Sequence, residues 1–336
     1  MKQNISLGLG PMSVEILKSI NSFSIKYNKK IMIICSRNQI ETEKLGGGYV
    51  NNFTTNKFSN FIEKMKNNNL IVCRDHSGPY KKDNKIKKKL TLEIDDCKKS
   101  LEDDIKNNFK IIHIDTSECK SAKYEIAKEL INFCNEKAKI LKKKIEFEFG
   151  SEKHGILTPI KDFKKDINFF NQFHNRRYIV CQTGSLVKSI FQVGQFDSKG
   201  VTDMKKIALN HGIELKEHNC DYLNKEQFEL RKLFGINAIN IAPEMGFLQT
   251  NLIYLKSKQL RLDKYFNNFF SLVLKKNKWK KWNYNKENNY VKFLSAGHYH
   301  YSSKEYNILK EEINKKISLQ KLLDGIVENN LYKYFN

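Results

Sequence analysis

The stretch 111-IIHIDTSECKSAKYEIAKELINFCNEKAKILKKKIEFEFG-150 decides the fold class, because it contains a strand, a helix and a second strand in succession. Its first and last six residues are β-branched and aromatic runs, the composition typical of strands. Between these runs, residues 122–141 repeat apolar side chains at the three- and four-residue spacing of an amphipathic helix. A strand, a helix and a strand in this order predict a βαβ unit with parallel strands.

The same alternation extends over most of the chain, with amphipathic stretches such as 12–27 and 201–212 between short apolar runs. Eight such units favour a closed (β/α)8 barrel over an open sheet. The predicted strands are 5-ISLGLG-10, 31-IMIICS-36, 70-LIVCRDH-76, 111-IIHIDT-116, 145-IEFEFG-150, 178-YIVCQTG-184, 213-IELKEHN-219 and 237-NAINIAP-243.

An open sheet with a dinucleotide loop is the alternative, since 8-GLG-10 precedes a predicted helix. However, Pro11 and Met12 interrupt the G-x-G-x-x-G pattern, and the next strand ends in Cys35-Ser36-Arg37 without the expected acidic residue. The dinucleotide-binding interpretation is therefore rejected.

We assign residues 1–250 to the barrel and residues 251–336 to a C-terminal extension that packs on it and is a candidate oligomer interface. We expect the segment that follows the eighth strand to begin with a helix from Glu244 to near Ser271 and to close with a final helix. The pair of histidines in 298-HYH-300 has no predicted place relative to the barrel. The Gly-rich segment 38-NQIETEKLGGGYVNN-52 leaves two interpretations open, a lid close to a ligand and a plain surface loop.

The charge and cysteine content narrow the function classes. Lys and Arg number 60 against 37 Asp and Glu, which gives a net charge of +23. The lysines are spread over all predicted helices instead of forming one stripe, so we expect no nucleic-acid partner, and a positive field that attracts phosphorylated or carboxylated substrates. Seven cysteines without C-x-x-C spacing predict a reduced, cytoplasmic protein. The sequence shows no signal peptide and no apolar run of bilayer length, so we expect no membrane partner.

Polar side chains follow nearly every predicted strand, whereas the strand starts carry no comparable set. In a (β/α)8 barrel the carboxyl ends of all strands meet on one face, where catalytic residues lie. This asymmetry predicts an enzyme. The strand-end residues are Arg37, Asn38, Gln39, Asp75, His76, Asp115, Glu148, Glu152, Gln182, His218, Asn240 and Glu244.

The sharpest motif is 74-RDHSGP-79, after the third strand. Neighbouring Asp75 and His76 are expected to point in different directions, so that one binds a metal ion and the other handles a proton. His218 follows the seventh strand, which faces the third across the barrel mouth. With a carboxylate from the fifth strand, either Glu148 or Glu152, the two histidines form a set suited to zinc or another divalent ion. His154 is a further candidate ligand.

The end of the sixth strand is a candidate phosphate site. We expect Gly184 and Ser185 to begin a helical turn whose backbone N–H groups face a phosphate, with Lys188 adding charge. The predicted substrate- and phosphate-binding residues are Arg37, Gln39, Arg74, Gln182, Gly184, Ser185, Asn240 and Glu244.

With these strand ends side by side, the chain resembles the class II tagatose-bisphosphate aldolase family, and most closely the branch called the non-catalytic subunit. The matching pieces run in order through nearly the whole chain. They are 36-SRNQ-39, 46-GGGY-49, 75-DHSGP-79, 150-GSE-152, 182-QTGSLV-187, 218-HNCDY-222, 237-NAINIAPEMG-246 and 297-GHYHYS-302.

The resemblance implies a (β/α)8 barrel, a phosphorylated sugar as ligand, Asp75 as the group that exchanges a proton, and His76 and His218 as zinc ligands. The family's catalytic branch has a further histidine after the sixth strand, where this chain has Gln182. Its Asn-Val-Ala-Thr phosphate segment appears here as 240-NIAPE-244, without the Thr. Glu152 is the candidate for the missing ligand and a second catalytic carboxylate.

Two functions follow from the resemblance. One is metal-dependent aldol chemistry on a ketose phosphate, either cleavage or C4 epimerisation, which share their first step. The other is a non-catalytic subunit that binds and stabilises a separate catalytic aldolase subunit. Retention of Asp75, His76, Glu152 and His218 favours the first, and Gln182 in place of a histidine favours the second.

Overall fold

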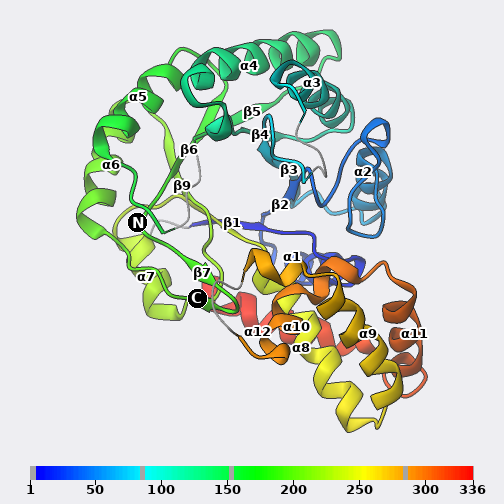
Figure 1. The fold of residues 1–336 in the computed structure, drawn as a ribbon. Helices are drawn as coiled ribbons and strands as arrows, with labels where there is room; N and C mark the ends of the chain where they lie inside the picture. Colours follow the sequence, from blue (N-terminus) through cyan, green and yellow to red (C-terminus); the bar gives the residue numbers. More distant parts are fainter. Residues whose placement is uncertain (1–4, 84–87, 151–154, 283–286, 336) are drawn as a thin grey trace.

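The computed structural model describes residues 5–83, 88–150, 155–282 and 287–335. Eight parallel strands close into a barrel in the order β1-β10-β9-β6-β5-β4-β3-β2, which confirms the predicted (β/α)8 fold and its eight strands (Figure 1). The strands are β1 Ser6–Leu9, β2 Ile31–Ser36, β3 Leu70–Ser77, β4 Ile111–Ile114, β5 Glu146–Phe149, β6 Arg176–Cys181, β9 Glu214–Glu217 and β10 Ala238–Ile241.

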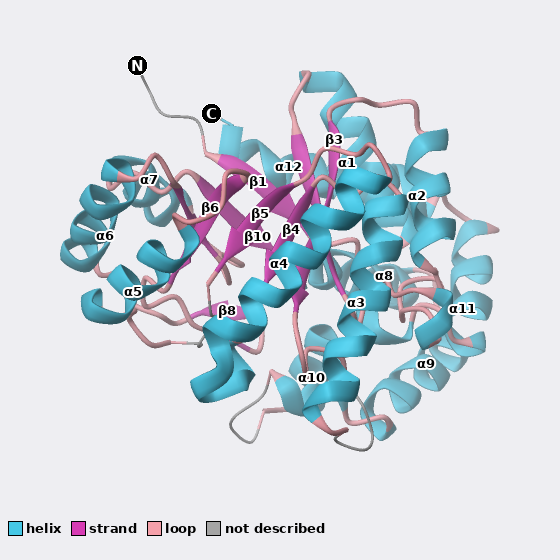
Figure 2. Ribbon diagram, turned by 90° about the horizontal axis from the view of Figure 1, so that it is seen from above, coloured by secondary structure: helices cyan, strands magenta, loops and turns pink. Residues whose placement is uncertain are grey.

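Helices surround the strands on the outside of the barrel (Figure 2). Their apolar faces pack against the outward-facing side chains of the strands, such as Ile33, Ile112 and Phe147, all fully buried. The helices that follow the strands are α1 Val14–Tyr27, α2 Thr55–Lys64, α3 Leu90–Lys106, α4 Lys123–Ile140, α5 Ile160–Phe170, α6 Ser198–Asn210, α7 Lys225–Leu233 and α8 Pro243–Gln259.

The C-terminal part contains four more helices, α9 Asp263–Lys275, α10 Asn289–Ala296, α11 Lys304–Asn314 and α12 Leu319–Phe335. The single helix predicted from Glu244 to near Ser271 is wrong, because Arg261 takes a left-handed backbone conformation (φ 55°) that separates α8 from α9. In Figure 1, α9–α11 gather beside α8 while α12 returns to α1. There the ring of Phe335 lies 5.4 Å from the ring of Phe23.

The interior of the barrel changes from apolar to polar along its axis. Towards the amino ends of the strands it is filled by a buried apolar layer of Met32, Ile34, Cys73, Ile111, Tyr178 and Ala238. Towards the carboxyl ends, the inward positions carry Asp75, His113, Glu148, Lys216, His218 and Asn240 instead. Gly8 of β1 makes room for this polar layer, because a Cβ atom at Gly8 would lie 2.3 Å from Asn240 Oδ1.

The segment after β6 differs from the prediction. Gly184 and Ser185 do not begin a helical turn, since they lead into a short antiparallel hairpin of β7 (Val187–Lys188) and β8 (Phe191–Gln192). The Gly184 backbone has φ 94°, which a helix excludes, and the next helix begins only at Ser198. The helical turn expected there for a phosphate is therefore absent from this described segment.

The Gly-rich segment after β2 is folded against the barrel. A short 3-10 helix, Glu43–Leu45, ends in two glycines with positive φ, and Ile40 and Val50 are buried. A Cβ atom at Gly48 would lie 2.0 Å from the carbonyl oxygen of Gln39, so only glycine fits this close approach of two backbone segments.

All seven cysteines are free and buried. Every helix in the described ranges is too short or too polar to cross a bilayer.

Candidate metal centre and active site

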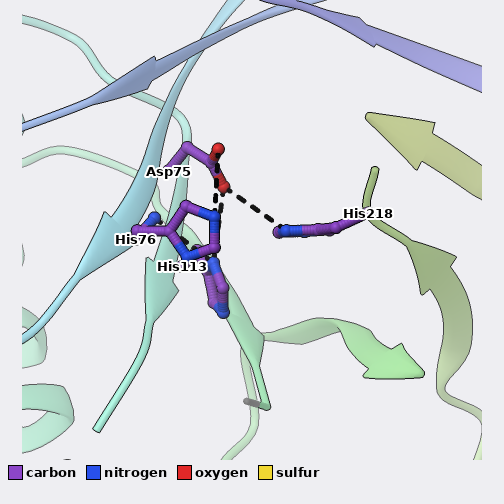
Figure 3. Close-up of side chains that lie close together, drawn as sticks. All are labelled: Asp75, His76, His113 and His218. Carbon is purple, nitrogen blue, oxygen red and sulfur yellow. Dashed lines mark hydrogen bonds and ion pairs between the residues drawn. The ribbon is translucent and has the colours of Figure 1, made fainter. Parts of the chain in front are cut away.

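Four side chains meet at the carboxyl ends of three strands: Asp75 and His76 of β3, His113 of β4 and His218, which follows β9 (Figure 3). Each offers one potential metal-binding atom, and these four atoms all lie within 4.8 Å of one another. The three imidazole rings form a nearly equilateral triangle, with centroids 5.1, 5.2 and 5.1 Å apart. The arrangement is therefore a compact cluster of three histidines around one carboxylate.

Each histidine directs one ring nitrogen outward to an oxygen atom. His76 Nδ1 lies 2.9 Å from Asp115 Oδ2, His113 Nε2 lies 3.1 Å from the Gly150 carbonyl oxygen, and His218 Nε2 lies 2.5 Å from Glu148 Oε1. An oxygen acceptor on the outer nitrogen fixes the tautomer and orientation of a metal-binding imidazole, and is found behind nearly all such histidines.

The other ring nitrogens face Asp75. His76 Nε2 lies 3.6 Å from Asp75 Oδ2, and the Nδ1 atoms of His113 and His218 lie 3.4 and 3.9 Å from Asp75 Oδ1. The backbone N–H of His76 donates to His113 Nδ1 over 3.3 Å, so this nitrogen carries a lone pair, which a bound metal ion would take over.

The cluster fits a divalent metal ion. Three imidazole nitrogens form a ligand set that zinc and similar ions accept, and the Asp75 carboxylate lies beside them. The Asn240 Nδ2 atom lies 3.1 Å from His218 Nε2, whereas the buried Oδ1 of Asn240 has no hydrogen-bond partner among the described residues. That oxygen is available to a bound ligand.

The backbone of β3 explains how neighbouring residues reach the same cluster. Asp75 and His76 do not point in different directions as predicted, because His76 adopts φ 48° and the pairing of β3 with β4 shifts register between Arg74 and Ser77. Strand alternation still holds one residue earlier, since Arg74 points outward to α3.

A buried ion pair supports the cluster from below. Lys216 Nζ lies 2.5 Å from Glu148 Oε2, and both side chains are almost completely buried. Burial alone would raise the pKa of the Glu148 carboxyl, but Lys216, His113 and His218 outweigh it and lower that pKa to about 2. Glu148 is therefore an ionised acceptor for His218, and Lys216 is a positioning residue.

Replacing Lys216 with Met is expected to weaken metal binding about 10- to 100-fold, the usual cost of losing a partner behind a metal ligand. Without Lys216, Glu148 is free to shift away from His218. The measurement is competition for zinc with a chromogenic chelator. The matched control is Lys205→Met, since Lys205 Nζ bonds to the neutral Asn237 side chain, 2.9 Å away, and to no carboxylate of the described residues. An unchanged zinc affinity in folded Lys216→Met would contradict the supporting role.

A cavity of about 570 Å³ opens above the cluster. Of the predicted site residues, Gln39, Asp75, His76, His218 and Asn240 line it. Asp75 and His76 reach the cavity with side chains 13% and 23% exposed, whereas those of His113 and His218 are 0% and 2% exposed. A ligand in the cavity would therefore meet Asp75 and His76 first.

The other predicted binding residues in the described ranges lie outside this cavity lining, and contacts within the fold explain several of them. Arg37 Nε is 2.8 Å from Glu41, and Arg74 makes two hydrogen bonds with Asp104 between β3 and α3. The residues that do not line the cavity are Arg37, Arg74, Gln182, Gly184, Ser185 and Glu244.

Ser185 and Glu244 take part in separate buried networks. Ser185 bonds to Glu217 and Arg231 behind β9. Glu244 accepts hydrogen bonds from Asn330 and Lys333, and thereby attaches α8 to α12. The remaining candidates, Glu152 and His154, lie outside the described residues.

Sequence reasoning missed His113. It is a single polar residue in a short isoleucine-rich strand, and the pairing of β4 with β5 sets it beside Glu148. Side chains at the same register of neighbouring parallel strands face the same side of the sheet. Because Glu148 points inward and His113 lies at the same register, His113 also points inward. The pairing of these two strands is therefore the signal that could have identified His113.

The C-terminal part forms one wall of the cavity. Among the described residues, its contribution consists of Lys278, Lys281, Trp282, His298 and Tyr299, which places the first two residues of 298-HYH-300 at the barrel mouth. The wall is anchored to the barrel, since Ser189 N–H donates to the carbonyl oxygen of Trp282 over 2.8 Å. The Trp282 indole N–H donates to Tyr299 Oη over 3.0 Å.

Fold and cluster together define the chain as a (β/α)8-barrel protein with a histidine–aspartate cluster suited to a metal ion at the barrel mouth. Solved structures of similar fold include a probable tagatose 6-phosphate kinase from Sinorhizobium meliloti, with a TM-score of 0.81 and 13% identity over 99% of both chains. They also include a fructose-bisphosphate aldolase from Campylobacter jejuni, with a TM-score of 0.59 and 12% identity over 99% of this chain and 90% of that one.

The YdjI aldolase of Escherichia coli is similar at a TM-score of 0.54, with 12% identity over 94% of this chain and 91% of that one. No family model matches the sequence. No curated protein matches it either. The structural neighbours agree with the barrel fold that the resemblance to the tagatose-bisphosphate aldolase family implied.

Proposed function

We propose that this protein catalyses metal-dependent aldol chemistry on a phosphorylated sugar. The observation that carries the proposal is the triangle of His76, His113 and His218, each held by an oxygen acceptor behind it and each turned towards Asp75. Two of the similar folds are described as aldolases, which supports the same reaction class. His113 supplies the third imidazole that Gln182 does not.

The proposed roles follow from the positions of the residues. His76, His113 and His218 hold the metal, which when bound would act as a Lewis acid on the carbonyl and adjacent hydroxyl oxygens of a ketose. Asp75 accepts the proton of the C4 hydroxyl as the C3–C4 bond breaks, and its electrons stay on the fragment that carries the carbonyl. Asn240 holds Asp75 Oδ1 through a 3.5 Å contact of its Nδ2 atom.

Asp75 is ionised at the start of the reaction, as a proton acceptor must be. Burial by itself would raise the pKa of its carboxyl, but the neighbouring His76 and His218 hold that pKa well below its usual value.

Separation of the two fragments gives cleavage, whereas rotation and renewed addition of the aldehyde gives C4 epimerisation.

The phosphate group is assigned to the C-terminal wall. Arg37 and Arg74 are paired with carboxylates and lie outside the cavity lining. The cationic side chains that line the cavity are Lys81, Lys278 and Lys281. Lys81 is bonded to Asp115, 2.9 Å away. Among the described residues, the ion pair of Lys278 is an exposed 3.4 Å contact with Asp83, which leaves Lys278 and Lys281 to meet a phosphate.

The test is incubation of the zinc-loaded protein with a panel of ketose mono- and bisphosphates, followed by NMR. Triose products indicate cleavage, and a new ketose indicates epimerisation. Conversion of none of the sugars contradicts the proposal and favours the alternative, a non-catalytic subunit. That alternative is then examined by measuring whether the protein stabilises a separate catalytic aldolase subunit against heat.

Replacing both Lys278 and Lys281 with Ala is expected to raise KM for the phosphorylated sugar roughly 10- to 100-fold while kcat changes little, since two charge-assisted contacts made in ground and transition states alike are lost. The measurement is steady-state kinetics. The control pair is Lys276→Ala with Lys280→Ala, which removes the same charge from neighbours outside the cavity lining. Equal KM changes in both pairs would assign the effect to the general positive field.

A further inference from the structure

A second cavity lies at the opposite end of the barrel and is larger, about 880 Å³. Its lining comes from the amino ends of the strands, for example Leu7 of β1 and Tyr178 of β6, and from the end of α4 and the segment that follows it. The buried apolar layer of the barrel interior separates it from the metal cluster, because Ile111 forms part of that layer and His113 stands two residues further along β4. The two cavities are therefore distinct.

The floor of this second cavity is apolar. Leu7, Met32, Ile71, Ile111 and Tyr178 line it, and all except the partly buried Ile71 belong to the buried core. A volume of this size falls in the range of about 300–1,000 Å³ that small-molecule sites occupy, and such sites are mostly apolar with a few polar groups. The floor suits an apolar ring or chain.

The rim of the second cavity is strongly cationic. Its charged residues are Lys30, Lys110, Lys139, Lys143, Lys144, Arg177 and one carboxylate, Glu146.

Few of these cations have a counter-charge. Arg177 is paired with Glu214 at 3.4 Å and Glu146 at 3.9 Å, and Lys143 donates to the neutral Asn108 side chain. For the other four lysines, the described part of the chain offers no carboxylate at ion-pair distance. Like charges gathered around a low-dielectric hollow repel one another and focus a positive potential into it.

We propose that this second cavity binds a small molecule with several negative charges at one end and an apolar ring at the other, the chemistry of a nucleoside polyphosphate. The phosphates would lie on the lysines of the rim and the ring on the floor of Leu7, Ile71 and Ile111. The volume, the apolar floor and the excess of positive charge point to the same class of ligand, and none of them depends on the reaction at the metal cluster.

The experiment is titration calorimetry of the full-length protein with ATP, inorganic tripolyphosphate and adenosine. We expect saturable binding of ATP to one site, at least tenfold weaker binding of tripolyphosphate because the floor stays unused, and weaker binding still of adenosine. Absence of saturable ATP binding overturns the proposal. Equal affinities for ATP and tripolyphosphate also overturn it, because the floor would then play no part.

Charge reversal locates the site. Lys139→Glu with Lys144→Glu, two exposed rim positions, is expected to weaken ATP binding at least tenfold. The control, Lys161→Glu with Lys164→Glu on the exposed face of α5, changes the net charge equally and is expected to leave ATP binding unchanged. Equal weakening in both pairs overturns the proposal, as does loss of ATP binding in Lys278→Ala/Lys281→Ala, which would place the ligand in the other cavity. Circular dichroism confirms that each variant is folded.

Discussion

Replacing Asp75 with Asn is expected to lower turnover of the ketose phosphate about 10²- to 10⁴-fold, the usual contribution of a positioned general base. Asparagine keeps the shape of the side chain but cannot accept the C4 hydroxyl proton. The three imidazoles remain, so the metal content of the variant should stay near that of the original protein. Stopped assays of product by NMR, together with metal analysis of the same sample, measure both quantities.

The control for this experiment is Glu118→Gln, which neutralises an exposed carboxylate of the same cavity without touching the cluster. Its turnover is expected to remain within a small factor of the original. Undiminished turnover in Asp75→Asn would show that the base is another group. Loss of metal together with turnover would instead identify Asp75 as a ligand that the metal requires.

Replacing His113 with Gln is expected to lower the zinc affinity more than 100-fold, since a lost ligand should cost more than the 10- to 100-fold effect of a lost partner behind a ligand. The purified variant should carry far less metal than the near-stoichiometric amount expected of the original protein, and its turnover should fall in parallel. Glutamine is chosen because it nearly fills the space of the imidazole, whose side chain is completely buried.

His174→Gln is the matched control, because His174 is an exposed histidine outside the cluster. Metal content is measured by atomic emission after dialysis against a weak chelator. Full metal content in His113→Gln would show that β4 supplies no ligand, and the proposed third position would then return to Glu152. The same measurement on His76→Ala/His218→Ala, expected to be metal-free, tests the two ligands that the motifs alone identified.

Much of the fold follows from the sequence because it depends on local properties of the chain. The runs that became the eight barrel strands, such as 31–36 and 70–76, are short, β-branched and apolar, and each is separated from the next by a helix-period stretch. Parallel strands joined by helices leave few architectures open, and eight of them close into a barrel. The rule that strand ends share one face then places Asp75, His76 and His218 together.

Features that depend on backbone angles and register did not follow from the sequence. The positive φ of His76 and the shifted pairing of β3 bring two neighbours into one cluster, and the positive φ of Arg261 divides a predicted helix in two. Side-chain alternation along β3 directs Arg74 outward, where it pairs with Asp104. Arg74 is therefore not available to the phosphate for which the 74-RDHSGP-79 motif was predicted to supply it. Each of these backbone angles and side-chain directions depends on contacts with residues from elsewhere in the chain.

The sequence by itself therefore determined the barrel, the face on which the cluster lies and three members of that cluster, because strand and helix periods and strand ends are local. Only the tertiary structure decided that His113 completes the set, that Glu148 and Lys216 hold it from below, and that the C-terminal wall contributes Lys278 and Lys281 to the cavity. Those contacts join residues far apart in the chain, and their geometry is set by how the closed barrel aligns its strands and where the extension packs.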